Sequence, residues 1–131
     1  MGYLPDGLPL PETEFDDAPY WEGCRQRQLK IQRCVKCHTF RHPPDPICHS
    51  CGSFDTEWIE VSGKGTVFSY TFAYHPVHPA LRDAVPYNIA VVLLDDAGDV
   101  RLISNVVDAA PEEMKISMPV ELCWDPLPNG G

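Results

Sequence analysis

Four of the six cysteines in this chain follow a spacing that limits its fold more than any other feature. Cys34 and Cys37 form one C-x2-C pair, and Cys48 and Cys51 form a second pair after ten intervening residues. Two tight turns of this kind, joined by a short hairpin, bring four sulfur atoms around one tetrahedral ion. We therefore predict a zinc ribbon over residues 34–56 with these four cysteines as ligands. Because four sulfurs leave no position for water or substrate, the predicted zinc is structural.

The residues around the two pairs refine this prediction. Gly52 follows the second pair, where the turn favours a left-handed backbone, and His38 occupies the equivalent place after the first pair. His38 and His49 are alternative ligands, which four available cysteines make unnecessary. The remaining cysteines, Cys24 and Cys123, have no companions at ligand spacing, and we interpret them as buried, small apolar residues.

Residues 1–33 precede the ribbon and are predicted to form an extension, a short helix and a lead-in strand. Acidic residues and Pro19 suit a first helical turn, so we place the helix at 19–26. Tyr20, Trp21 and Cys24 share one face of this helix, which indicates packing on the domain or on a partner. Residues 28–33 alternate between apolar and polar types and are predicted to lead as a strand into the first cysteine pair.

Residues 57–131 alternate between short β segments and turns. The predicted strands are 58–61, 66–74, 88–94, 100–107 and 120–124, with a hairpin turn at 95–99 and one or two helical turns at 110–114. Several short antiparallel strands with one small helix before the last are typical of a Greek-key OB-fold. We therefore predict a mainly β chain with a short N-terminal helix, a zinc ribbon and a C-terminal five-stranded OB-fold barrel.

Two strands of the predicted barrel bear on function. Phe68, Tyr70, Phe72 and Tyr74 share one face of strand 66–74, and we expect them to fill the core; a stacking platform for bases is the alternative. Residues 89–94 of strand 88–94 are apolar on both faces, so the second face must be covered by this chain or by another subunit.

The charge of the chain limits its partners. A formal net charge of -9, from 19 acidic and 10 basic residues, argues against a nucleic acid as the main partner. Residues 23–44 nevertheless carry six basic residues and no acidic one. This basic island is either a solvated face or a surface for an acidic partner or a phosphate-bearing ligand. The chain contains no secretory signal and no run of about 18 apolar residues, so we expect a cytoplasmic protein without a membrane-spanning segment.

The connection 75–86 is long and contains three prolines, so we expect an ordered, projecting loop. His75, His78 and Arg82 invite a catalytic interpretation. However, no serine, cysteine or carboxylate stands with them in a recognisable nucleophile or dyad arrangement. We expect these three residues to contact a partner or a ligand instead.

Taken in order, the motifs of this chain resemble those of a family of acyl-CoA-associated proteins. This family combines an N-terminal helix, a rubredoxin-like zinc ribbon and a C-terminal OB-fold, and it has long been catalogued as a domain of unknown function. The resemblance covers about residues 15–125 and rests on segments 20–23 (YWEG), 33–37 (RCVKC), 43–44 (PP), 48–53 (CHSCGS), 62–67 (SGKGTV), 75–79 (HPVHP) and 118–121 (MPVE). Two positions differ from the family pattern. Asp45 replaces the usual arginine, which removes any ligand contact made by that arginine, and His38 replaces a frequent glycine.

The resemblance implies a function as well as a fold. Family members act beside thiolase-fold enzymes on coenzyme A thioesters, and one branch is similar to the partner of lipid-transfer-protein-like aldolases, which cleave steroid side chains by a retro-aldol reaction. By this resemblance the chain is expected to be a non-catalytic accessory subunit that completes or stabilises the active site of a thiolase-fold aldolase. The expected assembly is a heterotetramer, and its substrate is a steroid acyl-CoA thioester.

Six residues are expected to contact the partner or the ligand: Tyr20, Trp21, His75, His78, Arg82 and Tyr87. Two other functions remain as alternatives. One is an accessory subunit of an acyl-CoA condensing or acyl-transfer enzyme. The other is a nucleic-acid-binding module, which the net charge and the scarcity of basic residues on the barrel strands disfavour.

Overall fold

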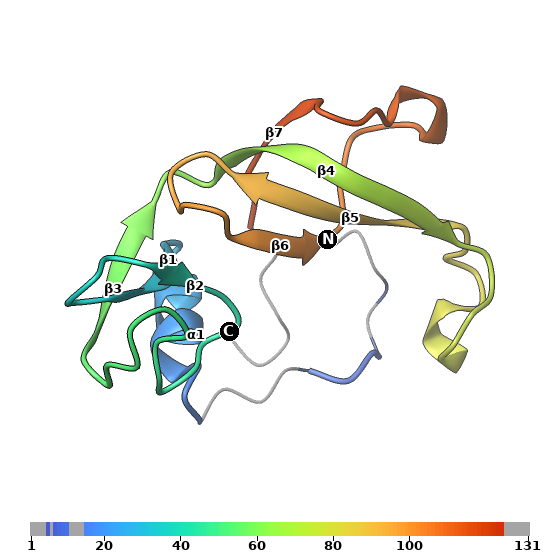
Figure 1. The fold of residues 1–131 in the computed structure, drawn as a ribbon. Helices are drawn as coiled ribbons and strands as arrows, with labels where there is room; N and C mark the ends of the chain where they lie inside the picture. Colours follow the sequence, from blue (N-terminus) through green and yellow to red (C-terminus); the bar gives the residue numbers. More distant parts are fainter. Residues whose placement is uncertain (1–4, 6, 11–14, 125–131) are drawn as a thin grey trace.

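The computed structural model describes residues 5, 7–10 and 15–124, which form one helix and two antiparallel sheets (Figure 1). Helix α1 spans Ala18–Arg25 and packs on the first sheet. This ribbon sheet has the order β2-β1-β3, with β1 at Leu29–Cys34, β2 at Phe40–Arg41 and β3 at Thr56–Val61. The predicted mainly β fold with one short N-terminal helix is confirmed.

The C-terminal sheet has the strand order β6-β5-β4-β7. Its elements are β4 (Lys64–Ala73), β5 (Tyr87–Leu94), β6 (Arg101–Ser104) and β7 (Pro119–Glu121), and two 3-10 turns, η1 (Pro79–Leu81) and η2 (Pro111–Glu113), lie in its connections. Figure 1 shows η1 beyond one end of the β4–β5 hairpin, with α1 and the ribbon sheet at the other end.

The strand count of this sheet corrects one expectation. Over the described residues the C-terminal sheet has four strands rather than five, because β3 belongs to the ribbon sheet. The backbone of β3 pairs with β1 along its whole length, from Leu29 opposite Val61 to Cys34 opposite Thr56. Gly63 then adopts a positive φ of 79° and turns the chain into β4.

The main core lies where the two sheets meet. Leu29, Ile31 and Val61 of the ribbon sheet form one buried cluster with Leu94, Ala97 and Val100 around the β5–β6 turn. The Asp96 carboxylate fixes this turn by accepting a hydrogen bond from the backbone N–H of Ser62 at 2.9 Å. Since burying one Leu, Ile or Val side chain contributes about 1.5–3 kcal/mol, this cluster is a major link between the two halves.

Helix α1 is short and is held at both ends. The Trp21 indole N–H donates to the Asp17 carboxylate at 2.8 Å across the first turn, and Pro19 lies at the start of the helix. At the other end a Cβ on Gly23 would come within 2.8 Å of the Gln28 carbonyl oxygen, so only glycine allows β1 to leave the helix at this angle. No helix among the described residues is long and apolar enough to cross a membrane.

A β-bulge in β4 breaks the predicted inward row of aromatic side chains, so the prediction is wrong for Phe68 and Tyr74 and partly right for Tyr70 and Phe72. Val67 pairs with Val92, and the next pair is Ser69 with Val91, so Phe68 is the extra residue. The bulge reverses the alternation, and as a result Val67 is fully buried whereas Phe68 is 49% exposed. Tyr70 and Phe72 are half-buried and meet edge to face, and Tyr74 lies beyond the strand, 73% exposed.

Candidate metal centre and contact surfaces

The four cysteines predicted as ligands lie together at one end of the ribbon. Their sulfur atoms are all within 4.8 Å of one another. The Sγ atoms of Cys34 and Cys51 are 3.5 Å apart, and those of Cys37 and Cys48 are 3.6 Å apart. A tetrahedral zinc with zinc–sulfur bonds of about 2.3 Å places its sulfurs about 3.8 Å apart. The donor set therefore fits one zinc ion in both chemistry and size.

The two turns that present these sulfurs have the same backbone design. In each, the residue that follows the pair has a positive φ, 62° at His38 and 75° at Gly52, as their positions in the sequence predicted. The N–H of His38 donates to the Cys34 carbonyl and that of Gly52 donates to the Cys48 carbonyl, at 3.0 and 2.9 Å. Over the described residues the four cysteines are the only cluster with metal-binding geometry, so neither His38 nor His49 takes part.

Hydrogen bonds in the first turn favour thiolates, which are the forms that bind zinc. The hydroxyl and the backbone N–H of Thr39 lower the pKa of the Cys37 thiol to about 6. The backbone N–H of Cys37 lowers the pKa of Cys34 in the same way. The backbone and side-chain hydrogen bonds of the first turn therefore favour the thiolate forms of Cys34 and Cys37 in the metal-free chain.

A buried polar clamp, which sequence analysis did not identify, holds the loop between β2 and the second cysteine pair. The Arg41 guanidinium donates through Nε and Nη2 to the Asp45 carbonyl oxygen, at 3.0 and 2.8 Å. Gln32, which pairs with Arg41 between β1 and β2, accepts from the Asp45 N–H at 2.9 Å. Both side chains are buried. Arg41 is one of six basic residues in segment 23–44, and no local sequence pattern indicated that it alone of them is buried.

The helix residues expected to contact a partner are partly used within the chain. Tyr20 packs against the main core, and burial raises the pKa of its hydroxyl to about 12. Trp21 is half-buried, meets the Tyr20 ring edge to face at 5.0 Å and bonds to Asp17. Cys24 is half-buried beside Tyr20, but Cys123 is exposed, so the expectation that both are buried is wrong for Cys123.

The other expected contact residues lie far from the helix. His75 and Arg82 are exposed, whereas His78 is half-buried, and its Nδ1 accepts a hydrogen bond from the Ala80 N–H at 3.1 Å. His78 and Arg82 line one shallow hollow of about 150 Å³. Tyr87 begins β5 opposite Ala73. Figure 1 shows this loop and α1 at opposite ends of the molecule, so the six residues do not form one patch.

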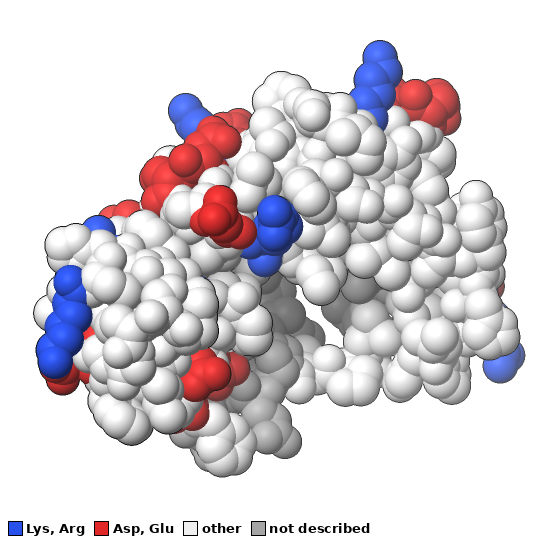
Figure 2. All heavy atoms as spheres, viewed as in Figure 1, with Lys and Arg blue, Asp and Glu red and all other residues white. Residues whose placement is uncertain are grey.

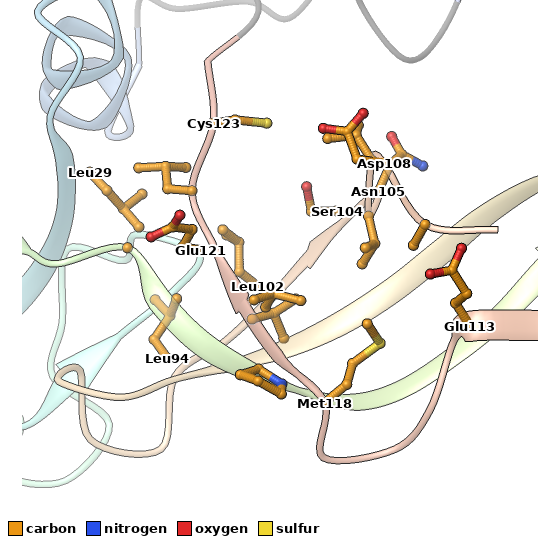
Figure 3. A pocket seen from close by; sticks show the side chains of 18 residues that line it. Leu29, Leu94, Leu102, Ser104, Asn105, Asp108, Glu113, Met118, Glu121 and Cys123 are labelled. Carbon is orange, nitrogen blue, oxygen red and sulfur yellow. The ribbon is translucent and has the colours of Figure 1, made fainter. Parts of the chain in front are cut away.

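A larger cavity of about 440 Å³ opens on the inner side of the C-terminal sheet. Leu94, Leu102 and Met118 give it apolar walls, and carboxylates from β7 and from the β6–β7 connection stand around the same space (Figure 3). Glu113, one of these carboxylates, accepts from the Ala110 N–H at 2.9 Å and therefore caps η2. No histidine is among the described residues that line this cavity, and no pair of them forms a nucleophile with its base.

The outer face of the C-terminal sheet is apolar and poorly covered. Val91 of β5 lies opposite Ile103 of β6, which is 73% exposed. The bulged Phe68 is exposed nearby and carries the Arg101 guanidinium over its ring at 4.3 Å. In the view of Figure 2 the described surface over this sheet is broadly uncharged, and the charged side chains lie around its edges and over the ribbon.

Together, the fold and the cysteine centre define a small protein built from a zinc ribbon followed by an OB-fold. Family models agree with both parts: the rubredoxin-like zinc ribbon domain of ChsH2 matches residues 21–57, and the C-terminal OB-fold domain of ChsH2 matches residues 58–125. The chain belongs to this ChsH2 family, which is also called DUF35. The predicted rubredoxin-like ribbon and OB-fold are confirmed.

Similar proteins cover this chain almost completely. It is 47% identical over 116 residues to a probable enoyl-CoA hydratase alpha subunit of Thermomonospora curvata, with 88% of this chain and 35% of that protein aligned. It is 33% identical over 125 residues to the 3-oxo-4,17-pregnadiene-20-carboxyl-CoA hydratase alpha subunit of Mycobacterium tuberculosis, with 95% and 39% aligned. The chain thus spans little more than a third of the length of these two relatives.

Shorter relatives match over most of their own length. A DUF35 domain-containing scaffold protein of Methanocaldococcus jannaschii is 33% identical over 116 residues, covering 85% of this chain and 78% of that protein. Among solved structures, a chain titled Ltp2-ChsH2(DUF35) aldolase is 45% identical with a TM-score of 0.76, covering 89% of this chain and 91% of that chain. A Sulfolobus solfataricus DUF35 protein of unknown function, 20% identical with a TM-score of 0.52, shares the fold.

Proposed function

We propose that this chain is a non-catalytic accessory subunit of a thiolase-fold enzyme that acts on acyl-CoA thioesters. The specific proposal is a retro-aldolase that cleaves the side chain of steroid-CoA substrates in the cytoplasm. The likeness to a chain of an Ltp2-ChsH2 aldolase, over about nine-tenths of both chains, carries this proposal. The scaffold names of the archaeal relatives agree with a subunit that organises its neighbour.

The chemistry of the described residues supports the non-catalytic part of the proposal. The four clustered thiols form a closed ligand set, so the proposed zinc stabilises the ribbon and offers no open position to a substrate. His78 uses its Nδ1 in a local cap, and no carboxylate of a described residue forms a hydrogen bond or ion pair with either loop histidine. The steroid-CoA chemistry is therefore assigned to the partner.

The outer face of the C-terminal sheet supports docking to a partner. Ile103 and Phe68 expose apolar surface beside Val91 on a strand that is apolar on both faces. A stable interface removes about 800 Å² per partner from water, and a central apolar cluster usually dominates its energy. We propose that this face lies against the thiolase-fold subunit and that two copies of the chain flank a partner dimer in a heterotetramer.

Reconstitution tests this proposal. When the chain is mixed with a thiolase-fold aldolase from the same cells, we expect co-elution in size-exclusion chromatography and retro-aldol cleavage of a steroid-CoA thioester, with neither protein active alone. The Ile103→Asp variant is expected to lose at least about tenfold in affinity, whereas Ile116→Asp, at another exposed isoleucine, keeps wild-type affinity. Separate elution together with full activity of the thiolase-fold protein alone would refute the proposal.

A second candidate follows from the longer relatives. Two of them are named as hydratase alpha subunits, and this chain matches about a third of each. An accessory role beside a different acyl-CoA enzyme, such as a hydratase or a condensing enzyme, is therefore the alternative. Activity of the reconstituted complex with an enoyl-CoA, and none in retro-aldol cleavage, would favour it.

A further inference from the structure

We propose that a pocket around Arg41 binds a single carboxylate group. This Arg41 pocket has a volume of about 370 Å³ and lies between the second half of the ribbon and the β5–β6 connection. The ribbon contributes Arg41, His42 and His49, and the connection contributes Asp99 and Arg101. Two elements far apart in sequence thus contribute two arginines and two histidines to the lining of one pocket, with the Arg101 guanidinium itself stacked on the Phe68 ring.

The hydrogen bonding of Arg41 is the main argument. Arg41 is only 5% exposed, and its Nε and Nη2 both donate to one neutral acceptor, the Asp45 carbonyl. Within the described residues, its Nη1 and the neighbouring His42 Nδ1 are buried and have no hydrogen-bond partner, and no carboxylate forms an ion pair with Arg41. A buried cation without a counter-charge is costly, so an anion that completes its hydrogen bonding is bound favourably.

The rim of the pocket selects the kind of anion. A guanidinium matches the planar geometry of a carboxylate, and such charge-assisted bonds are about twice as strong as neutral ones. The exposed acids Asp45 and Asp99 also line the pocket and repel multiply charged groups. A monoanion suits this balance better than a phosphate chain. Because Arg41 Nη1 is buried, binding requires neighbouring side chains to shift, and the exposed Arg101 guanidinium leaves the Phe68 ring to contact the carboxylate.

Acetate is the direct probe of this site. In ¹H–¹⁵N spectra of the full chain, acetate is expected to shift the Nε–H signals of Arg41 and Arg101 in a saturable way, whereas chloride at equal ionic strength does not. Unchanged signals, or equal shifts with chloride, would overturn the proposal. A stronger response to pyrophosphate than to acetate would overturn the assignment to a single carboxylate.

Substitutions at the rim of the pocket are expected to change the acetate affinity in opposite directions. Arg101→Gln is expected to weaken acetate binding about fivefold and Asp99→Asn to strengthen it about threefold, because one attractive and one repulsive charge are removed. Arg27→Gln and Asp95→Asn, at exposed residues outside the pocket, are the matched controls and leave the affinity unchanged. Arg41→Lys is expected to abolish saturable acetate binding. Because Arg41 also holds the loop, this variant can fail to fold, and in that case Arg101→Gln and Asp99→Asn decide the test. Equal affinities for wild type and both rim variants would contradict the site.

The carboxylate can come from a protein side chain or from a small free acid, and the partner complex distinguishes these sources. This step alone rests on the proposed function, whereas the acetate titration does not. If an acidic side chain of the thiolase-fold partner fills the pocket, acetate competes with complex formation and Asp99→Asn tightens it. If a free acid fills it, acetate still binds to the assembled complex and association is unchanged.

Discussion

The ribbon and the C-terminal sheet are stabilised by different interactions. Around the cysteine centre the large apolar side chains of Val35, Ile47 and Phe54 are exposed, so little apolar surface is buried there. In the C-terminal sheet Val67 and Ala90 are fully buried instead. We therefore expect the outer half of the ribbon to depend on the proposed zinc, whereas the sheet depends on burial and on a few internal hydrogen bonds.

Removal of the proposed zinc is expected to have the largest effect, and to affect the ribbon but not the C-terminal sheet. Cys48→Ser removes one of the four proposed zinc ligands, which is buried. Structural zinc contributes about 10–16 kcal/mol of apparent binding free energy in small zinc domains. We expect elemental analysis to give one zinc per wild-type chain and less in the variant, with loss of amide-exchange protection at 34–53 and retention along β4 and β5. Cys123→Ser, at an exposed cysteine outside the cluster, is the control and retains zinc.

Acid is expected to act on the same half. In the metal-free ribbon the pKa of Cys37 is lowered to about 6 from an ordinary value of 9.0, so above pH 6 this side chain is already a thiolate when zinc binds. Below pH 6 protons compete with zinc for the thiolate, and the apparent zinc affinity is expected to fall more steeply. Titration of the metal-free chain with zinc against a chromogenic chelator between pH 7 and pH 5 measures this affinity. An apparent affinity independent of pH over this range would contradict the role of the thiolate.

A core substitution is expected to affect both halves together. Leu94 is buried in the cluster that also contains Leu29 and Val61, so Leu94→Ala leaves a cavity in the core that joins the two sheets. We expect a loss of about 2–5 kcal/mol in the free energy of unfolding measured in urea. Ile116→Ala, at an exposed isoleucine, is expected to change stability by less than about 0.5 kcal/mol. Retention of β4–β5 protection with an unfolded ribbon would show that the core does not couple them.

Removal of the buried Asn88 side-chain amide is expected to destabilise the C-terminal sheet and to leave the ribbon unchanged. The Asn88 side chain donates to the Val106 carbonyl and accepts from the Val106 N–H, both at 2.7 Å, and ties the chain after β6 to β5. Asn88→Ala leaves these backbone groups unpaired and is expected to cost about 1–3 kcal/mol. Ser69→Ala on the exposed side of β4 is the control. Faster amide exchange at Val106, with zinc content unchanged, is the expected signature.

The smallest effects concern the two cysteine turns. His38 holds a left-handed backbone that glycine adopts without strain, so His38→Gly is expected to stabilise the ribbon by up to about 1 kcal/mol. Gly52→Ala is expected to destabilise it by about 1 kcal/mol. A Cβ at Gly52 meets no other atom within 4 Å, so only the backbone conformation is tested. Equal zinc affinities for wild type and both variants would contradict this account.

Part of the molecule was determined by short-range patterns in the sequence. The clustering of the two C-x2-C pairs, the left-handed residues after them and the position of α1 depend on neighbouring residues. The structure places the first two as predicted, and α1 begins and ends one residue earlier than predicted. The alternation of short β segments also predicted most strands of the C-terminal sheet. These features follow from local geometry and ligand chemistry, which act over a few residues.

Other features were decided only by the tertiary structure. The pairing of β3 with β1, the bulge at Phe68, the clamp of Arg41 on Asp45 and the exposure of Cys123 were not predicted. Each depends on which distant segment lies alongside. A strand carries the same alternation in either sheet, and one inserted residue changes the face of every side chain around it. An arginine in a basic segment becomes a buried cation only when two separate elements fold around it.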